Sequence, residues 1–248
     1  TPTPTRTRTP TRTPTPTRTP TPTRTPTPTA TPTPVPLPVY LPIALREPKC
    51  VPGKQRIDVV LVIDTSSSMR ELTGRGREKL AAALEAAAVF LGNMALIDGD
   101  QAAIVFFNRE ARLARGLTSD RAALDRTLAA PTVATQTCLV CGVEAALAEL
   151  TGPRDRAGHT AAMIVLTDGL SNPRPAGEAV SAARAAKGAG VVVFTVGLGR
   201  VLDFDSLAEM ATYRRYFYRT DDAEELAGIY REIAVEIPCP AGAYWAGF

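Results

Sequence analysis

The chain has 248 residues and a formal net charge of +3, but charge and composition are divided unevenly along it. Residues 1–34 have threonine at every odd position, and their even positions hold eleven prolines, five arginines and one alanine. The remaining residues include 23 basic and 25 acidic side chains, so their formal charge is −2. The basic character therefore belongs to the repeat, and composition argues against a nucleic-acid-binding domain.

Membrane insertion has no support within the sequence, because no apolar run approaches the ~18 residues that a spanning helix needs. No signal peptide is visible either. Since the chain opens on Thr1 rather than methionine, we interpret it as a fragment or a processed product. Attachment to a membrane would then require an anchor upstream of Thr1.

The Thr/Pro repeat at residues 1–34 cannot bury enough apolar surface to offset the entropy of an ordered chain. Alternating proline favours polyproline II backbone, which spans roughly 3 Å per residue, or about 100 Å over the repeat. Such compositions are also typical of O-glycosylated stalks in exported proteins. We interpret this segment as a disordered stalk, with a non-specific tail as the alternative. The apolar, proline-rich residues 35–56 are predicted to be a linker or strap along the following domain.

From Ile57 onward, short apolar runs alternate with segments of helical periodicity. The sequence predicts strands at residues 57–63, 102–107, 111–117, 161–167, 191–196 and 216–219, and helices at residues 78–95, 119–129, 143–150, 177–187, 206–211 and 221–235. Strands that are apolar on both faces and alternate with helices indicate a mostly parallel six-stranded sheet covered on both sides. We therefore predict a doubly wound α/β domain over residues 57–236, followed by a C-terminal extension at residues 237–248.

Three polar segments would meet at one edge of such a sheet. The run DTSSS at residues 64–68 follows the first strand, DG at residues 168–169 follows a later one, and TQTCLVCG at residues 135–142 leads into a helix. In doubly wound folds, ligands bind beyond the carboxyl ends of the strands where the strand order reverses. Carboxylates and hydroxyls without nitrogen or sulfur ligands suit hard cations such as Mg²⁺, Mn²⁺ or Ca²⁺.

These segments resemble the metal-ion-dependent adhesion site (MIDAS) of the von Willebrand factor type A (VWA) family. That family has Asp-x-Ser-x-Ser after the first strand, a threonine in a later loop, and an aspartate usually followed by glycine after the fourth strand. The corresponding residues here are Asp64, Ser66, Ser68 and Asp168. Thr137 is the favoured threonine because TCLVCGVEAAL fits the family's run into a helix, and Thr135 is the competitor. The resemblance covers about residues 57–235.

The resemblance implies a Rossmann-like VWA fold and a divalent cation, with Mg²⁺ as the first expectation and Mn²⁺ or Ca²⁺ as alternatives. Ser66, Ser68 and Thr137 would supply hydroxyl ligands, while Asp64 and Asp168 would act directly or through water. One coordination position would remain for a Glu or Asp carboxylate of a partner protein. We therefore expect an extracellular or cell-surface adhesion module. The alternative is a structural domain of a cell-envelope or matrix assembly in which the metal serves stability.

The four cysteines suggest two pairs. Cys50 precedes the first strand and Cys239 follows the last helix, while Cys138 and Cys141 form a C-x-x-C within the presumed metal loop. Some extracellular members of the family join their neighbouring termini, so the resemblance implies a Cys50–Cys239 disulfide. A Cys138–Cys141 disulfide would stiffen the loop, whereas a redox motif and a zinc site are weaker interpretations. Two pairs favour an oxidising compartment.

Enzyme motifs are not matched. A haloacid-dehalogenase-like phosphatase needs a second aspartate two residues after the first, where this chain has Ser66. The chain has no G-x-S-x-G elbow, and the glycines at residues 197 and 199 do not continue as G-x-G-x-x-G. His159 is interpreted as a loop histidine. We expect no enzymatic activity.

Overall fold

A single mixed sheet forms the centre of the domain in this computed structural model, which describes residues 55–73 and 75–237. The predicted stalk lies outside these residues, as do residues 35–54 of the predicted strap and residues 238–248 of the predicted extension. Cys50 and Cys239 lie outside them too, and with them the expected disulfide.

The sheet has the strand order β3-β2-β1-β4-β5-β6. Its strands are β1 (Ile57–Asp64), β2 (Gln101–Phe107), β3 (Ala111–Thr118), β4 (Thr160–Thr167), β5 (Val192–Leu198) and β6 (Phe217–Thr220). Only the pairing of β2 with β3 is antiparallel, and all other neighbours are parallel. The predicted mostly parallel six-stranded sheet is confirmed, and the strand order reverses direction between β1 and β4.

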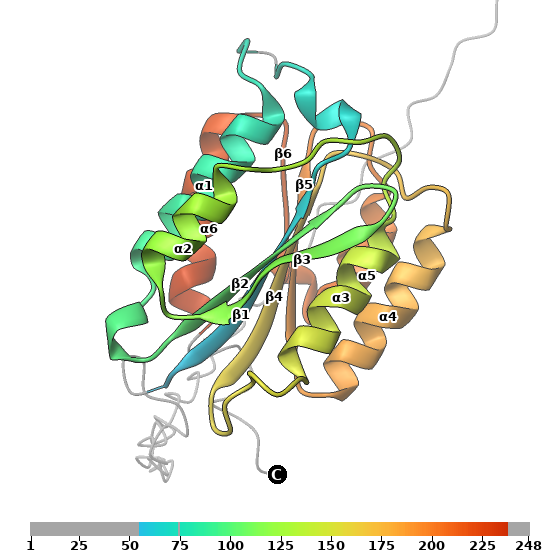
Figure 1. Cartoon of the computed structure of the whole chain (residues 1–248). Coiled ribbons are helices and arrows are strands. Elements are labelled where there is room, and N and C mark those ends of the chain that lie inside the picture. The colour runs from blue at the N-terminus through green and yellow to red at the C-terminus, as the bar shows by residue number, and fades with distance from the viewer. Residues whose placement is uncertain (1–54, 74, 238–248) are drawn as a thin grey trace, which may run out of the picture. The chain divides into compact units, whose positions relative to one another are not determined.

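Helices cover both faces of the sheet (Figure 1). The α-helices are α1 (Lys79–Asn93), α2 (Arg121–Leu128), α3 (Leu139–Leu150), α4 (Ala176–Gly188), α5 (Phe204–Met210) and α6 (Leu226–Glu236). Short 3₁₀ helices occupy Ser67–Arg70, Leu96–Asp98, Arg214–Tyr216 and Ala223–Glu225. Helices α1, α2 and α6 lie on one face, and α3, α4 and α5 lie on the other. No described helix is long and apolar enough to cross a bilayer.

Strand β1 divides its side chains between two hydrophobic cores. All eight of its residues are buried. Val59 and Leu61 belong to the core beneath α1 and α6, whereas Val60 and Val62 belong to the core beneath α3 and α4. Because successive side chains of a strand point to opposite faces, an uninterrupted apolar run is what a strand buried on both faces requires. This explains why β1 could be predicted from its composition.

Several helix boundaries differ from the predicted ones, most of them by one or two residues. Helix α3 begins at Leu139 rather than residue 143, because the C-x-x-C segment forms its N-cap and first turn. Helix α5 begins at Phe204, where Asp203 accepts a hydrogen bond from the Ser206 backbone N–H. The predicted helix at residues 221–235 is divided into a 3₁₀ turn and α6.

Helix α3 approaches the sheet closely at Gly142. A Cβ atom at this position would lie 2.9 Å from Val62 Cγ1 and 3.0 Å from Phe107 Cδ1. The glycine therefore lets the start of α3 lie against β1 and β2. This contact holds the loop that precedes α3 near the carboxyl ends of both strands.

A matched pair of glycine substitutions tests this packing. Gly142→Ala is expected to lower the free energy of unfolding by about 1–3 kcal/mol, because the added methyl group overpacks the interface. Gly228→Ala in α6 meets no atom within 4 Å and is expected to raise it by up to about 1 kcal/mol. Urea unfolding of both variants in EDTA measures the difference. Shifts in the same direction would contradict the assigned contact.

Candidate metal centre

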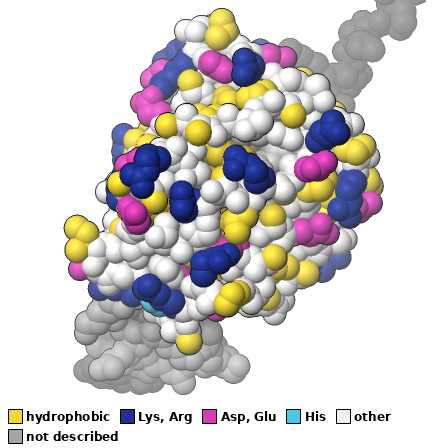
Figure 2. All heavy atoms as spheres, in the orientation of Figure 1, with side chains coloured by type: hydrophobic (Ala, Val, Ile, Leu, Met, Phe, Trp, Pro, Cys, Tyr) yellow, Lys and Arg dark blue, Asp and Glu magenta, His cyan; other side chains and the backbone are white. Residues whose placement is uncertain are grey.

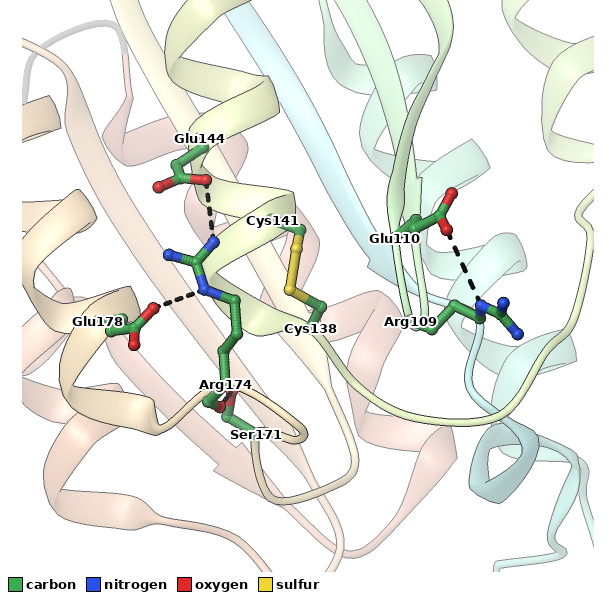
Figure 3. The surroundings of a disulfide bond; sticks show 8 residues. All are labelled: Arg109, Glu110, Cys138, Cys141, Glu144, Ser171, Arg174 and Glu178. Carbon is green, nitrogen blue, oxygen red and sulfur yellow. Dashed lines mark hydrogen bonds and ion pairs between the residues drawn. A yellow bond between two sulfur atoms is a disulfide. The ribbon is translucent and has the colours of Figure 1, made fainter.

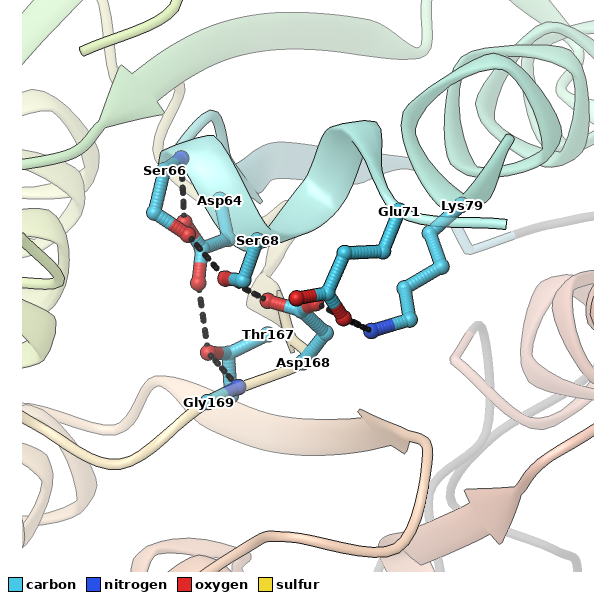
Figure 4. A network of polar contacts seen from close by, with 8 residues as sticks. All are labelled: Asp64, Ser66, Ser68, Glu71, Lys79, Thr167, Asp168 and Gly169. Atoms are coloured by element: carbon cyan, nitrogen blue, oxygen red, sulfur yellow. Dashed lines mark hydrogen bonds and ion pairs between the residues drawn. The ribbon is translucent and has the colours of Figure 1, made fainter. Parts of the chain in front are cut away.

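The predicted site residues lie at the carboxyl edge of the sheet, where β1 and β4 run side by side. Asp64 is the last residue of β1, and Asp168 directly follows β4. The register pairs Ile63 with Leu166, so these two strands end at the same level. The short 3₁₀ helix after β1 carries Ser68 toward Asp168 (Figure 4). The topology thus brings together segments that are about 100 residues apart in sequence.

Asp64 is a fully buried carboxylate. Its Oδ1 accepts a hydrogen bond from the Ser66 backbone N–H (2.7 Å), and its Oδ2 accepts one from Thr167 Oγ1 (2.6 Å). Burial raises the pKa of Asp64 from 3.8 to about 6, even though both hydrogen bonds oppose that change. The carboxylate is therefore fixed in direction, and its charge is stabilised less than that of an exposed aspartate.

Hydroxyl groups connect the two strand ends. Ser66 Oγ and Ser68 Oγ lie 3.0 Å apart, and Ser68 Oγ donates a hydrogen bond of 2.7 Å to Asp168 Oδ1. Ser66 is buried and Ser68 is half-buried. A hydroxyl oxygen that donates one hydrogen bond still has lone pairs with which to bind a cation.

Thr137 lies beside this chain of oxygens. Thr137 is buried, and its backbone N–H and C=O both pair with Asn172. A Cβ atom built on Gly169 would lie 3.7 Å from Thr137 Oγ1 and 3.9 Å from Ser68 Oγ, so both hydroxyls border the same small space. Thr135 is exposed. Gln136 between them has a φ of 72°, a strained backbone conformation of the kind found at functional sites.

Lys79 and Glu71 belong to the same cluster, although they are not among the residues predicted for the site. Lys79 Nζ donates hydrogen bonds of 2.8 Å to Asp168 Oδ2 and 2.8 Å to Glu71 Oε2 (Figure 4). Burial is the largest single influence on the Lys79 pKa and lowers it, but the interactions with the two carboxylates outweigh burial and raise that pKa. Lys79 is also the first residue of α1, where a positive charge opposes the helix macrodipole. That unfavourable placement is the one local signal that singles out Lys79, and it does not identify Asp168 as its partner.

A cavity of about 420 Å³ opens beside these groups. Its lining includes Ser68, Glu71, Lys79, Thr137 and Asp168. A ligand from outside the domain can therefore reach the Ser68, Thr137 and Asp168 border of the cluster, whereas Asp64 and Ser66 lie deeper.

The donor set fits a hard divalent cation. Two carboxylates and three hydroxyls converge, and oxygen-only sets of this kind bind Mg²⁺, Mn²⁺ or Ca²⁺. Within residues 55–73 and 75–237, no group of three or more His, Cys, Asp or Glu side chains is arranged to hold a metal. A thiolate and imidazole site for zinc therefore has no support in this part of the chain.

A disulfide closes the first turn of α3, immediately after Thr137. Cys138 and Cys141 are bonded, the pairing that the C-x-x-C segment allowed, and their Cα atoms lie 5.3 Å apart (Figure 3). The backbone N–H of Cys138 donates to the carbonyl of Asn108, which follows β2. The covalent link and this hydrogen bond together restrain the end of the loop that carries Thr137.

His159 lies at the opposite edge of the sheet. It precedes β4, and its Nδ1 lies 2.8 Å from Oδ1 of the buried Asp58 near the start of β1. The backbone N–H of Arg156 donates to the other oxygen of Asp58 (2.9 Å). His159 is therefore a partly buried residue of the amino edge and has no part in the candidate centre.

The raised pKa of Asp64 predicts a pH-dependent stability in the metal-free protein. Folded Asp64 keeps a proton up to about pH 6, whereas unfolded aspartate loses it near pH 3.8, so the free energy of unfolding falls as pH rises between these values. The expected loss is about 3 kcal/mol relative to Asp64→Asn, which does not titrate. Urea unfolding of both proteins in EDTA from pH 4 to pH 7 measures it. A difference that does not vary with pH would contradict this interpretation.

Known proteins share the family and the fold of this chain. Residues 58–232 match the von Willebrand factor type A domain. Similar solved structures include proximal thread matrix protein 1 (PTMP1) from the mussel byssus, with a TM-score of 0.65 and 20% identity over 75% of this chain and 48% of that chain. Another is the vWF domain of the type V pili tip protein Mfa5 from Porphyromonas gingivalis, with a TM-score of 0.63 and 18% identity over 73% of this chain and 94% of that chain. Comparison with curated proteins finds no significant match.

These likenesses concern the fold, since all the identities are low. This chain covers less than half of the mussel protein's length. One PTMP1 structure, with a TM-score of 0.62 and 22% identity over 75% of this chain and 48% of that chain, has a zinc-occupied MIDAS motif. The family match covers well over half of the present chain and agrees with its sheet topology. The chain belongs to the von Willebrand factor type A domain family.

Proposed function

We propose that this domain binds a divalent cation and uses it to bind an acidic side chain of a partner protein. The proposed ligands are Asp64, Ser66, Ser68, Thr137 and Asp168. The observation that carries the proposal is the convergence of hydroxyls from two loops around Gly169, between two carboxylates and beside an open cavity. None of these groups requires a change of fold to reach the others.

The chemistry of the ligands favours recognition of a carboxylate. When bound, the cation supplies a localised positive charge that a partner's Glu or Asp can approach through the cavity. Three of the five proposed ligands are neutral hydroxyls, and the carboxylate of Asp168 is already paired with the Lys79 ammonium group, so the cluster neutralises only part of that charge. Mg²⁺ is the first expectation for such an oxygen set, with Mn²⁺ and Ca²⁺ as alternatives.

The surroundings of the cavity suit a protein partner. Leu170 and Val201 line it, and they are 50% and 71% exposed. Exposed apolar side chains around a polar centre are typical of protein-binding surfaces. On the face shown in Figure 2, basic and acidic side chains are interspersed and do not gather into one basic patch. With the net charge of −2 outside the repeat, this distribution argues against nucleic acid as the partner.

We further propose an extracellular or cell-surface location and a role in binding rather than catalysis. The Cys138–Cys141 disulfide is typical of an oxidising compartment. Solved proteins of similar fold include a byssus matrix protein, a pili tip protein and a pilus adhesin, SpaC from Lactobacillus rhamnosus GG (TM-score 0.63 and 16% identity over 76% of this chain and 31% of that chain). The matrix protein also supports the second candidate, a structural domain in which the metal serves stability.

Substitution of either carboxylate tests the metal site. At a Mg²⁺ concentration 100 times the dissociation constant, bound metal is expected to stabilise the protein by about 2.7 kcal/mol and to raise its melting temperature by several degrees. Asp64→Ala and Asp168→Ala are expected to remove that rise, because each deletes a proposed ligand. Asp98→Ala, which changes an exposed aspartate outside the cluster, should retain it. A full Mg²⁺ response in both site variants would refute the site.

Peptide capture separates adhesion from a purely structural metal. An array of synthetic peptides that each contain one glutamate, paired with copies carrying glutamine instead, is probed with the full chain in Mg²⁺ and in EDTA. Adhesion predicts capture that requires both the glutamate and Mg²⁺. Metal-dependent stability without carboxylate-dependent capture would instead support the structural alternative.

A further inference from the structure

We propose that Lys79 sets the affinity of the site for its cation, because its ammonium group is a fixed positive charge that competes with the metal for Asp168. The inference rests on the proposed metal binding, and it adds a residue that lies outside the five expected ligands. Lys79 would make the domain a weak binder of free cation and a stronger binder when a partner carboxylate is present.

The first support is the geometry of Asp168. Its Oδ2 accepts the hydrogen bond from Lys79 Nζ (2.8 Å), and its Oδ1 accepts the one from Ser68 Oγ (2.7 Å). Both oxygens of this proposed ligand are therefore engaged, and one of them by a full positive charge. Figure 4 shows Lys79 reaching the carboxylate from the start of α1.

The second support is burial. The Asp168 side chain is fully buried and the Lys79 side chain is 14% exposed, so water screens their interaction only weakly. An ammonium group that has lost most of its hydration is held in place only by strong partners. Asp168 is one such partner, and Glu71, whose side chain is 67% exposed, is the other.

These contacts have a direct consequence for cation binding. A divalent cation that binds Asp168 would share that carboxylate with the ammonium group, and the two positive charges would repel each other. Lys79 also offsets one of the two negative charges of the proposed ligands. The five oxygens should therefore bind free cation less tightly than they would if a neutral side chain occupied position 79.

A partner carboxylate would reverse this effect. It would bring a negative charge close to both the cation and the ammonium group, and so reduce the repulsion between them. Because coupling between two ligands is reciprocal, the partner would tighten binding of the metal by the same factor as the metal tightens binding of the partner. Lys79 would thereby link occupancy of the metal site to the presence of the partner.

Isothermal titration calorimetry of the full chain with Mg²⁺ tests the proposal. Lys79→Met removes the charge and keeps most of the side-chain volume, and it is expected to tighten Mg²⁺ binding by about tenfold. Lys79→Arg keeps the charge and should stay within about twofold of the native protein. Lys187→Met removes the same charge near the C-terminal end of α4, outside the cluster, and should leave Mg²⁺ affinity unchanged. Unchanged or weaker binding by a folded Lys79→Met protein would overturn the proposal.

A second variant keeps the proposal testable if Lys79→Met does not fold. Glu71→Gln removes the charge of one of the two carboxylates that hold the ammonium group and leaves Asp168 as its only charged partner in the cluster. It is expected to weaken Mg²⁺ binding about threefold, since the charge of Lys79 is then less compensated. Affinity equal to that of the native protein would count against the role of Lys79.

The outcomes also distinguish this inference from the proposed function. If the native protein shows no saturable Mg²⁺ binding, the proposed metal site itself fails. If the native protein binds Mg²⁺ and Asp64→Ala does not, while Lys79→Met matches the native affinity, only the role of Lys79 fails.

Discussion

A carboxylate buried at the end of the central strand is the constraint on which this site depends. Strand β1 is buried along its whole length, so Asp64 reaches the carboxyl edge of the sheet without solvent to stabilise its charge. The Ser66 backbone and the Thr167 hydroxyl compensate only in part, and the pKa of Asp64 remains raised to about 6. The buried end of β1 therefore depends on polar groups from its own turn and from the end of β4.

The two carboxylates of the cluster are compensated in different ways. Neutral hydrogen-bond donors surround Asp64, and its charge remains costly, whereas Asp168 is paired with the ammonium group of Lys79. A cation bound between them would stabilise the negative charge of Asp64 and would compete with Lys79 for Asp168. In the metal-free site one of the two carboxylate charges, that of Asp168, is therefore already compensated. This difference would lower the affinity for metal.

Local patterns predict the sheet and the positions of both carboxylates, because strands β1, β2, β4 and β5 are apolar on both faces and each carboxylate stands at a strand end. The family pattern favours Thr137 over Thr135. In the structure Thr137 is buried and Thr135 is exposed, and Gln136 between them has a φ of 72°. Helix α3 starts at Leu139 rather than at residue 143, because the prediction places Cys138 and Cys141 in the loop before the helix. The contact between Lys79 and Asp168 spans 89 residues, so no local pattern could reveal it.

The shape of the site bears on whether a bound metal would serve recognition or stability. A metal that only stabilises a fold is usually enclosed by protein ligands, whereas a site that acts on another molecule keeps a position open. Here Ser68, Thr137 and Asp168 line a cavity of about 420 Å³ whose border includes the exposed Leu170 and Val201. A structural role alone would not require an apolar border next to the metal. The arrangement therefore favours a partner that contributes both a carboxylate and apolar contacts.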